Sequence, residues 1–287
     1  MAFRNMKACA AIALSAAMVL SMAACGTSDK ADSSASGGSS SSSSTTGYDV
    51  SGVKKDDDIA AMLPDSVTKD GKLSIGMDTS YAPAEFLAED GKTPVGFDVD
   101  IAKALANIFG LEADPETSNF DSIIPSVGSK YDIGISSFTI TKERMEAVDF
   151  VSMFKAGSTW VVKKDNPNKV DTSSLCGLKI AVQTGTTQEE EVNEAQEQCK
   201  ADVFYADSPV AGYAIAQTED TLEALGEDVG VTKEAVAIKK GDSDTAKAVQ
   251  AALQKLMDDG TYMKILKHWG VESGAIDKAE INPTDLS

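Results

Sequence analysis

Residues able to bind a carboxylate gather in one short stretch of the sequence. Arg144 offers a planar guanidinium whose donors match the geometry of a carboxylate. The hydroxyl residues Ser136, Ser137 and Thr139 come shortly before it, after a predicted strand. In α/β sheets ligands bind beyond the carboxyl ends of strands, so this stretch is a candidate binding site. The alternatives are an exposed Arg144 that pairs with a neighbouring glutamate, and hydroxyls that only bond their own turn.

A second group of candidates lies further along the chain. Gly185-Thr186-Thr187 opens a predicted helix, and the free N–H groups at a helix start suit an anion. Asp207 ends a predicted strand and supplies a carboxylate there. The alternative for Thr187 is a helix cap alone, and Asp207 can also serve as the N-cap of the helix that begins at Ser208.

No group of residues indicates catalysis or a metal site. The chain has one histidine, His268, and no cluster of cysteines with metal-ligand spacing. Neither a Ser-His-Asp arrangement nor a Cys-His pair is visible. The sequence therefore predicts a binding protein that is not an enzyme and needs no metal or cofactor.

The elements that position these residues alternate between strands and helices. Asp98 is expected to be the N-cap of a helix that Gly110 ends. Breaks near residues 165 and 241 divide the pattern into two α/β groups, which predicts two lobes joined by two crossings. The alternating order implies a largely parallel sheet. The other predicted elements are strands at 72–78, 131–136, 158–162, 178–182, 202–206 and 235–239, and helices at 120–127, 141–148, 208–217, 244–258, 261–268 and one that ends at Cys199.

The first residues of the chain indicate the compartment in which the protein is expected. Arg4 and Lys7 begin the chain, and residues 8–24 are apolar or small and uncharged up to Cys25. A basic start, an apolar centre and small residues at the cut are typical of a secretory signal peptide. A cysteine directly after the cut resembles the bacterial lipoprotein signal, which implies that Cys25 carries a lipid. An ordinary signal peptide with an incidental cysteine is the alternative.

Composition limits the remaining possibilities. The tract Thr27–Gly47 is rich in Ser and Gly and has nothing to bury, so it is expected to be a flexible tether. About 240 residues remain, enough for one large domain or two lobes. The chain has 26 Lys and Arg against 45 Asp and Glu, and this net charge of −19 disfavours nucleic acid as a partner.

Two cysteines remain after the signal peptide and the anchor candidate. Cys176 and Cys199 form an even pair in an oxidising compartment, which favours a disulfide between them. Two free buried thiols are the alternative.

Short motifs follow one another along residues 70–275. They are Ser80–Pro83, Gly96–Leu105, Phe120–Pro125, Lys130–Ile133, Ser136–Arg144, Asp149-Phe150, Gly177–Lys179, Gln183–Thr187 and Asp258–Tyr262. In this order, and behind a lipoprotein-type signal, they resemble the polar amino acid binding proteins of ABC importers, the extracellular solute-binding proteins of family 3.

The resemblance implies a fold and a set of ligand contacts. The fold is a type II clamp of two α/β lobes, which closes over a ligand by a hinge motion. Arg144 would grip the α-carboxylate of a free L-amino acid, Asp207 would face its ammonium, and the family's other contacts surround them. The matching positions are Asp78, Tyr81, Phe120, Ser136, Ser137, Thr139, Arg144, Thr187 and Asp207. Tyr81 and Phe120 would sandwich the ligand side chain, whereas Asp78 either holds a polar side chain or only finishes its strand.

The resemblance also implies a role and leaves two competitors. A monomer anchored by its lipid to the extracytoplasmic face of the cytoplasmic membrane would deliver a small polar L-amino acid to the transmembrane subunits of an ABC importer. A secreted dehydratase-like enzyme on the same fold is one alternative, and a solute sensor for a membrane receptor is the other.

The expected divisions are a signal peptide at 1–24, a tether at 25–58, lobe 1 at 59–162 and 239–287, and lobe 2 at 163–238. Two features depart from the family pattern. The segment between Thr187 and Asp207 is about 20 residues shorter than usual, roughly one strand and one helix, so the second lobe is expected to be small. Glu234-Ala235 stands where the family commonly has Tyr-Gly.

Overall fold

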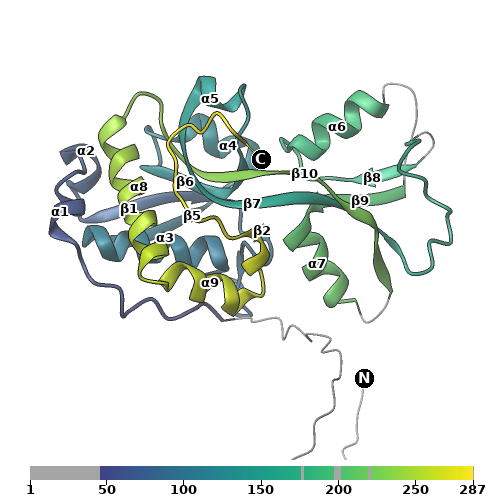
Figure 1. Cartoon of the computed structure of the whole chain (residues 1–287), viewed down its shortest axis with the longest axis horizontal. Helices are drawn as coiled ribbons and strands as arrows, with labels where there is room; N and C mark the ends of the chain where they lie inside the picture. Colours follow the sequence, from purple (N-terminus) through teal and green to yellow (C-terminus); the bar gives the residue numbers. More distant parts are fainter. Residues whose placement is uncertain (1–45, 176–177, 197–201, 219–220, 287) are drawn as a thin grey trace, which may run out of the picture. The chain divides into compact units, whose positions relative to one another are not determined.

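The computed structural model describes residues 46–175, 178–196, 202–218 and 221–286. One seven-stranded sheet runs through this part in the order β5-β1-β6-β10-β7-β9-β8, with helices on both faces (Figure 1). A second, three-stranded sheet has the order β2-β3-β4. The strands are β1 (Lys72–Met77), β2 (Ser80–Tyr81), β3 (Glu85–Leu87), β4 (Pro94–Val95), β5 (Glu112–Thr117), β6 (Ile133–Thr139), β7 (Val148–Lys163), β8 (Lys179–Ala181), β9 (Asp202–Asp207) and β10 (Leu222–Lys239).

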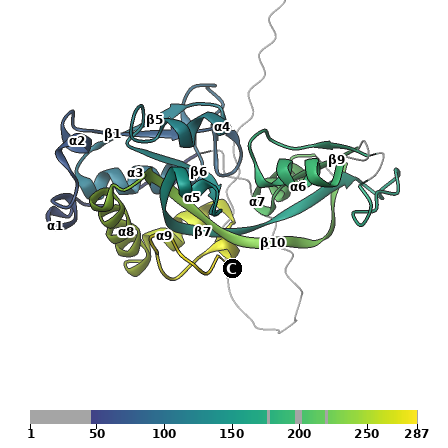
Figure 2. The same cartoon turned by 90° about the horizontal axis from the view of Figure 1, so that it is seen from above.

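Two long antiparallel strands connect the two lobes. β7 has 16 residues and β10 has 18, and they pair with each other along most of their length. On the first-lobe side β10 pairs with β6, and on the second-lobe side β7 pairs with β9. Figures 1 and 2 show the remaining elements gathered around the two ends of this strand pair. The expected two-lobed clamp is confirmed, and its crossings are continuous strands.

Several predicted elements differ from those observed. The predicted strands at 158–162 and 235–239 are only the ends of β7 and β10. The predicted helix at 141–148 is one short turn, α5 (Arg144–Ala147), because Val148 already pairs with β10. The sheet is mixed instead of largely parallel, since β10 runs antiparallel to both of its neighbours.

The first lobe packs helices against β1, β5 and β6. α3 (Phe97–Phe109), α8 (Ser243–Asp258) and α9 (Thr261–Trp269) cover one face, over side chains such as Leu73 and Ile75 that are fully buried. The short helices α1 (Asp57–Ala60), α2 (Asp65–Thr68) and η2 (Glu272–Gly274) lie in the same lobe.

The two ends of α3 can be compared with the helix start and helix end predicted from the sequence. Gly110 ends it as predicted, in the left-handed conformation with φ of 71° that glycine tolerates. The predicted N-cap, Asp98, is wrong. Gly96 occupies the cap position, and Asp98 is a buried residue of the first turn whose carboxylate accepts from Ser137.

The other face of the first lobe carries short helices. The predicted helix at 120–127 is one turn of α-helix, α4 (Phe120–Ile123), followed by the 3-10 turn η1 (Ile124–Ser126). Phe120 packs on Phe138 with ring centroids 5.0 Å apart. This contact joins the start of α4 to the sheet, at the point where β6 reaches the cleft.

The second lobe is small and has its own core. α6 (Thr187–Gln196) and α7 (Ser208–Ala216) accompany β8 and β9. Trp160 and Tyr205 stack with ring centroids 3.8 Å apart and an interplanar angle of 7°. β8 forms the outer edge of the sheet, whereas β9 stays paired with β7 and sets Asp207 opposite Ser158. The short segment before Asp207 is therefore compatible with a β9 that reaches the cleft.

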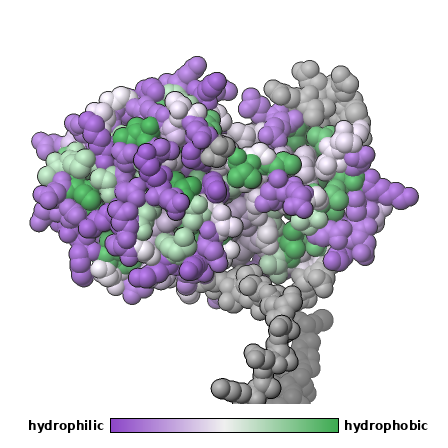
Figure 3. Space-filling view, in the orientation of Figure 1, coloured by the Kyte–Doolittle hydropathy of each residue, from purple (hydrophilic) through white to green (hydrophobic). Residues whose placement is uncertain are grey.

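Some expectations fall on other parts of the chain. Cys25, Cys176, Cys199, the whole predicted signal peptide and the predicted tether up to residue 45 lie outside the described residues. Among the described helices none has the length and apolar character needed to cross a membrane. In the same residues no group of His, Cys, Asp and Glu is arranged to hold a metal ion. The face in Figure 3 is mainly hydrophilic, with small separate apolar areas.

Candidate functional site

A small cavity lies where the two lobes meet. Its volume is about 10 Å³, enough for about one water molecule, so an amino acid can enter only if the lobes move apart. Most of the residues predicted to bind ligand line it. The lining residues are Tyr81, Phe120, Ser137, Thr139, Arg144, Gln183, Thr186, Thr187, Gln188 and Asp207.

Arg144 begins α5 and reaches across the cleft. Its Nη1 donates to the carbonyl of Thr139 in its own lobe, and its Nη2 donates to the carbonyl of Gly185 in the second lobe, both at 2.9 Å. Its guanidinium lies 5.4 Å from the ring centre of Phe120. Burial lowers the pKa of Arg144, while the negative charge of Asp207 acts in the opposite direction. Among the described residues Arg144 makes no ion pair with a glutamate. This argues against the alternative that Arg144 is an exposed residue paired with a neighbouring glutamate.

Asp207 is the last residue of β9 and is only 8% exposed. Its Oδ2 accepts from the Tyr81 hydroxyl at 2.8 Å, and its Oδ1 accepts from Nε2 of Gln188 at 2.6 Å. Asp207 stands at the N-cap position of α7, but its side chain makes no capping hydrogen bond there. Burial raises the pKa of Asp207 to about 6, against the opposing effects of Tyr81, Gln188 and Arg144. The carboxylate is therefore aimed at the cavity, away from the helix.

The hydroxyl residues of β6 divide into two kinds. Ser136, Ser137 and Thr139 lie within the last residues of the strand, not after it as predicted, because β6 runs to Thr139. Ser137 and Thr139 line the cavity. Ser136 is fully buried beneath it, with its hydroxyl between the carboxylate of Glu85 and the N–H of Asp78. The structure thus brings two of these three residues to the cavity.

Thr186 and Thr187, at the start of α6, have different roles. Thr186 caps the helix, since its Oγ1 accepts from the N–H of Glu189 at 3.1 Å. The Glu189 carboxylate in turn accepts from the N–H of Gly185 at 2.7 Å, an arrangement close to a capping box. Thr187 follows as the first helical residue and lines the cavity. Its alternative role as the helix cap belongs instead to Thr186.

Asp78 lies at the edge of the site. Its Oδ2 accepts from the N–H of Phe120 at 3.1 Å and from Nε2 of Gln183 at 3.0 Å. Gln183 belongs to the second lobe, so this is another bond between the lobes. Asp78 does not line the small cavity, whereas Gln183 does.

The sequence interpretation missed Gln183, Thr186 and Gln188 as cavity residues. Gln183 and Thr186 lie inside the motif that was compared with the family, so their position was a usable signal. Gln188 has no such signal, because it resembles an ordinary residue of the first helical turn. Its role depends on Ser158 and Asp207, which only the folded chain brings to it.

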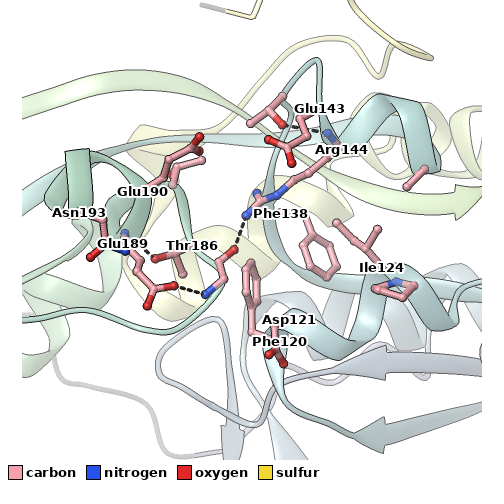
Figure 4. Close-up of a pocket in the computed structure, with 15 residues that line it drawn as sticks. Phe120, Asp121, Ile124, Phe138, Glu143, Arg144, Thr186, Glu189, Glu190 and Asn193 are labelled. Atoms are coloured by element: carbon pink, nitrogen blue, oxygen red, sulfur yellow. Dashed lines mark hydrogen bonds between the residues drawn. The ribbon is translucent and has the colours of Figure 1, made fainter. Parts of the chain in front are cut away.

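A wider depression of about 820 Å³ adjoins the cavity on the side of Arg144 and Phe120. Figure 4 shows Glu189, Glu190 and Asn193 of α6 facing the residues of α4 and α5 across it. Its charged lining is mostly acidic, with Asp121 and Glu143 on the first-lobe side. This depression offers a negatively charged approach to the cavity.

The chain belongs to the bacterial extracellular solute-binding proteins, family 3, which residues 73–272 match. It is 33% identical over 258 residues to the arginine-binding protein ArgT of Corynebacterium glutamicum, covering 80% of this chain and 84% of that protein. It is 30% identical over 228 residues to the L-cystine-binding protein TcyJ of Escherichia coli, covering 72% of this chain and 85% of that protein.

A solved structure extends the comparison to the fold. The ancestral amino acid-binding protein AncCDT-1, described as a precursor of cyclohexadienyl dehydratase, superposes with a TM-score of 0.65. The two chains are 35% identical, over 71% of this chain and 98% of that one. The family and the two-lobed fold expected from the sequence motifs are confirmed.

Proposed function

We propose that this chain captures a free L-amino acid outside the cell and passes it to the transmembrane subunits of an ABC importer. The observation that carries the proposal is that Arg144 and Asp207 line the same small cavity from different lobes. A guanidinium and a carboxylate on two sides of one cavity match the two charges of a zwitterion. Membership of the solute-binding family and the amino acid-binding relatives support the same role.

In this proposal the α-carboxylate of the ligand lies against Arg144, Thr139 and Thr187. A guanidinium has five N–H donors, and Thr139 and Gly185 use two of them, which leaves donors for a carboxylate. The ligand ammonium pairs with Asp207, and the rings of Tyr81 and Phe120 enclose the rest of the ligand.

We infer further that the ligand has a cationic side chain. The buried Oε1 of Gln183 receives no donor among the described residues and offers an acceptor at the cavity, and the negative charge of Asp78 lies beside it. The acidic side chains around the outer depression favour the approach of a cation. One relative is named as arginine-binding, which agrees with this inference.

A ligand screen tests both parts of the proposal. Thermal shift with each common amino acid, followed by calorimetry, is expected to identify basic amino acids, because a ligand at 100 times its Kd stabilises the native state by about 2.7 kcal/mol. Absence of a shift with every amino acid would refute amino acid binding. Binding of acidic amino acids alone would refute only the cationic side chain.

The proposal includes the expectations that concern the ends and boundaries of the chain. They are a signal peptide at 1–24, a lipid on Cys25, a tether that begins at residue 25, a Cys176–Cys199 disulfide and a monomeric protein held at the extracytoplasmic membrane face. The support is the order of basic, apolar and small residues at the start, and the Ser-rich tract that follows.

We also propose that the chain is not an enzyme, against the dehydratase alternative. The relation to a protein described as a precursor of cyclohexadienyl dehydratase makes this alternative specific. The curated relatives reported above are named as binding proteins, which supports the binding role. Incubation with prephenate and arogenate is expected to give no product, and turnover of either acid would establish the enzyme.

A further inference from the structure

Three buried carboxyl groups gather around Ser137, next to the ligand cavity. Glu85 on β3 and Asp98 on α3 are fully buried, and Glu234 on β10 is 2% exposed. Among the described residues none of the three makes an ion pair with a lysine or arginine. A buried charge without a partner is unfavourable, so carboxyl groups in such a place tend to hold or share protons.

Glu85 and Asp98 bind the two serines of β6. Ser136 donates its hydroxyl to Oε1 of Glu85. Ser137 donates both its N–H and its hydroxyl to Oδ2 of Asp98, at 2.7 and 3.2 Å. The φ of Ser137 is 45°, in the left-handed region that residues other than glycine rarely adopt. Its conformation therefore depends on contacts that outweigh the local cost, and Asp98 supplies two of them.

The two carboxyl groups are close enough to act on each other. Each changes the pKa of the other as a hydrogen-bond partner would. Glu85 Oε2 and Asp98 Oδ1 are buried, and neither receives an N–H or hydroxyl donor from the described residues. An ionised carboxylate can only accept, so a hydrogen bond between two carboxyl groups requires a proton on one of them. One proton placed between these two oxygens satisfies both.

We propose that Glu85 and Asp98 share one proton and act as positioning residues, which fix Ser136 and Ser137 in the conformation that binds ligand. Glu85 carries the proton and donates it in a hydrogen bond to Asp98. Asp98 stays ionised and accepts from Glu85 and from Ser137. The inference rests on the proposed function, because it takes Ser137 to contact the ligand.

The electrostatics of the pair agree with this assignment. Burial raises the pKa of Glu85 well above its usual range, and the neighbouring charge of Asp98 adds to the rise. Burial also raises the pKa of Asp98, to about 6, while hydrogen bonds from Ser137 and Glu85 oppose the rise. These directions favour a proton held by the pair, on Glu85 before Asp98. Because the pKa of Glu85 is raised, the pair loses that proton only as the pH rises through the folded-state pKa.

Other charged groups surround the pair. Asp78 after β1 acts on Glu85, and Asp207 on β9 and Glu234 on β10 interact with Asp98. Tyr81 on β2 and Arg144 on α5 interact in turn with Asp207. Burial first, and then the charges of Asp207 and Asp98, raise the pKa of Glu234. Arg144 is the cation of this group, and it acts on Asp207. A second negative charge at the pair therefore meets mainly like charges.

Infrared spectroscopy of the ligand-free protein tests the shared proton directly. At pH 8 the wild type is expected to show the carbonyl band of a protonated carboxylic acid, and Glu85→Gln is expected to remove one component of it. Glu234→Gln, the same change at a neighbouring buried carboxyl, is expected to leave that component in place. A wild type without a protonated band, or a Glu85→Gln spectrum identical to it, would overturn the proposal.

Calorimetry with L-arginine as the probe tests the positioning role. As the pH rises above 7 and Glu85 loses its proton, the wild type is expected to lose roughly 10- to 100-fold in affinity beyond any loss seen in Glu85→Gln, because hydrogen bonds to a charged group are lost with the proton. Glutamine keeps a donor toward Asp98 at every pH, so its profile is expected to stay flatter. Glu85→Ala is expected to bind weakly at pH 7, and equal affinities of the Ala and Gln variants would contradict the role.

Two features keep this test separate from the proposed function. If Glu85→Gln does not fold, Asp98→Asn replaces it, since asparagine can donate to Glu85 and accept from Ser137. If L-arginine does not bind the wild type, the proposed ligand class fails, whereas the infrared result still decides the shared proton. If the affinity of the wild type falls with rising pH in parallel with the affinities of Glu85→Gln and Asp98→Asn, the positioning role is overturned. The shared proton is not affected by that outcome.

Discussion

The hydroxyl of Tyr81 donates a 2.8 Å hydrogen bond to the carboxylate of Asp207, and the backbone N–H of Asp207 donates back to the same hydroxyl oxygen at 3.2 Å. Tyr81 belongs to the first lobe and Asp207 to the second. A ligand ammonium that pairs with Asp207 therefore shares this carboxylate with a residue of the opposite lobe. With the ligand placed as proposed, ligand binding and contact between the lobes would be coupled through the Asp207 side chain.

Arg144→Ala is expected to weaken amino acid binding at least ~30-fold. Removing one member of a buried charge pair costs roughly 2–5 kcal/mol, because the ligand carboxylate is left without a partner. Calorimetry on the folded variant measures the loss. The control is the matching amine without its carboxylate, for which wild type is expected to lose affinity and Arg144→Ala to discriminate far less. Unchanged amino acid affinity would show that Arg144 is not the carboxylate site.

Acid is expected to weaken binding through Asp207. The carboxylate must be ionised to pair with an ammonium, and burial raises its pKa to about 6, so affinity is expected to fall as the pH drops below that value. Stability of the ligand-free protein responds in the opposite sense. A raised folded-state pKa contributes stability at low pH that is lost as the pH rises through the folded pKa. Asp207→Asn is expected to remove the acid limb of the binding profile, and an unchanged limb in this variant would assign it to another group.

Gln188→Leu is expected to weaken binding roughly 10- to 150-fold without unfolding the protein. Gln188 holds Oδ1 of Asp207 at 2.6 Å, and a hydrogen bond to a charged group contributes about 1.5–3 kcal/mol. Gln254→Leu, at a half-buried position of α8 outside the cavity, is the matched control and is expected to bind as wild type. Equal affinities of the two variants would show that Gln188 does not orient Asp207.

Cys25→Ala is expected to release the protein from the membrane fraction. The lipid is the only attachment in this prediction, because the tether is polar and the chain is strongly acidic. Fractionation and mass spectrometry of the mature N-terminus check the result. A variant that stays in the membrane fraction, together with a wild type that carries no lipid, would show that the anchor prediction is wrong.

Thiol labelling of the unfolded, unreduced mature protein is expected to find neither Cys176 nor Cys199 free. A disulfide here closes a loop of about 24 residues, which stabilises the fold by roughly 3 kcal/mol in the chain-entropy model. The reduced protein is therefore expected to unfold at a lower temperature. Complete labelling of both cysteines before reduction would establish two free thiols instead.

Local patterns predicted the alternation of elements well and their lengths poorly. Gly110 ends α3 as expected, because a left-handed cap is a local property of glycine. The extent of β7 was missed since Lys155 and Gly157 interrupt its apolar pattern, and only pairing with β10 identifies the whole strand. Asp98 looked like a cap because its partner, Ser137, lies 39 positions away.

The candidate site shows the same limit. Arg144 and Asp207 were found through motifs, and the structure brings both to one cavity. Ser136 belongs to the same motif but lies beneath the cavity, because the alternation along β6 points it away from Ser137. Whether a residue of a motif touches the ligand or supports one that does is decided by strand register, which a motif does not contain.

The two crossing strands have a mechanical consequence. The pairing of β10 with β7 shifts register between Glu234 and Ala235, and its pairing with β6 shifts between Ala235 and Ala237. A strand ribbon bends and twists most readily where a bulge interrupts its ladder. Rotation of one lobe against the other can therefore be absorbed as torsion of this ribbon, while the hydrogen bonds on either side stay intact. The register shifts next to Ala235 are therefore where we expect the strand pair to bend when the lobes open and close.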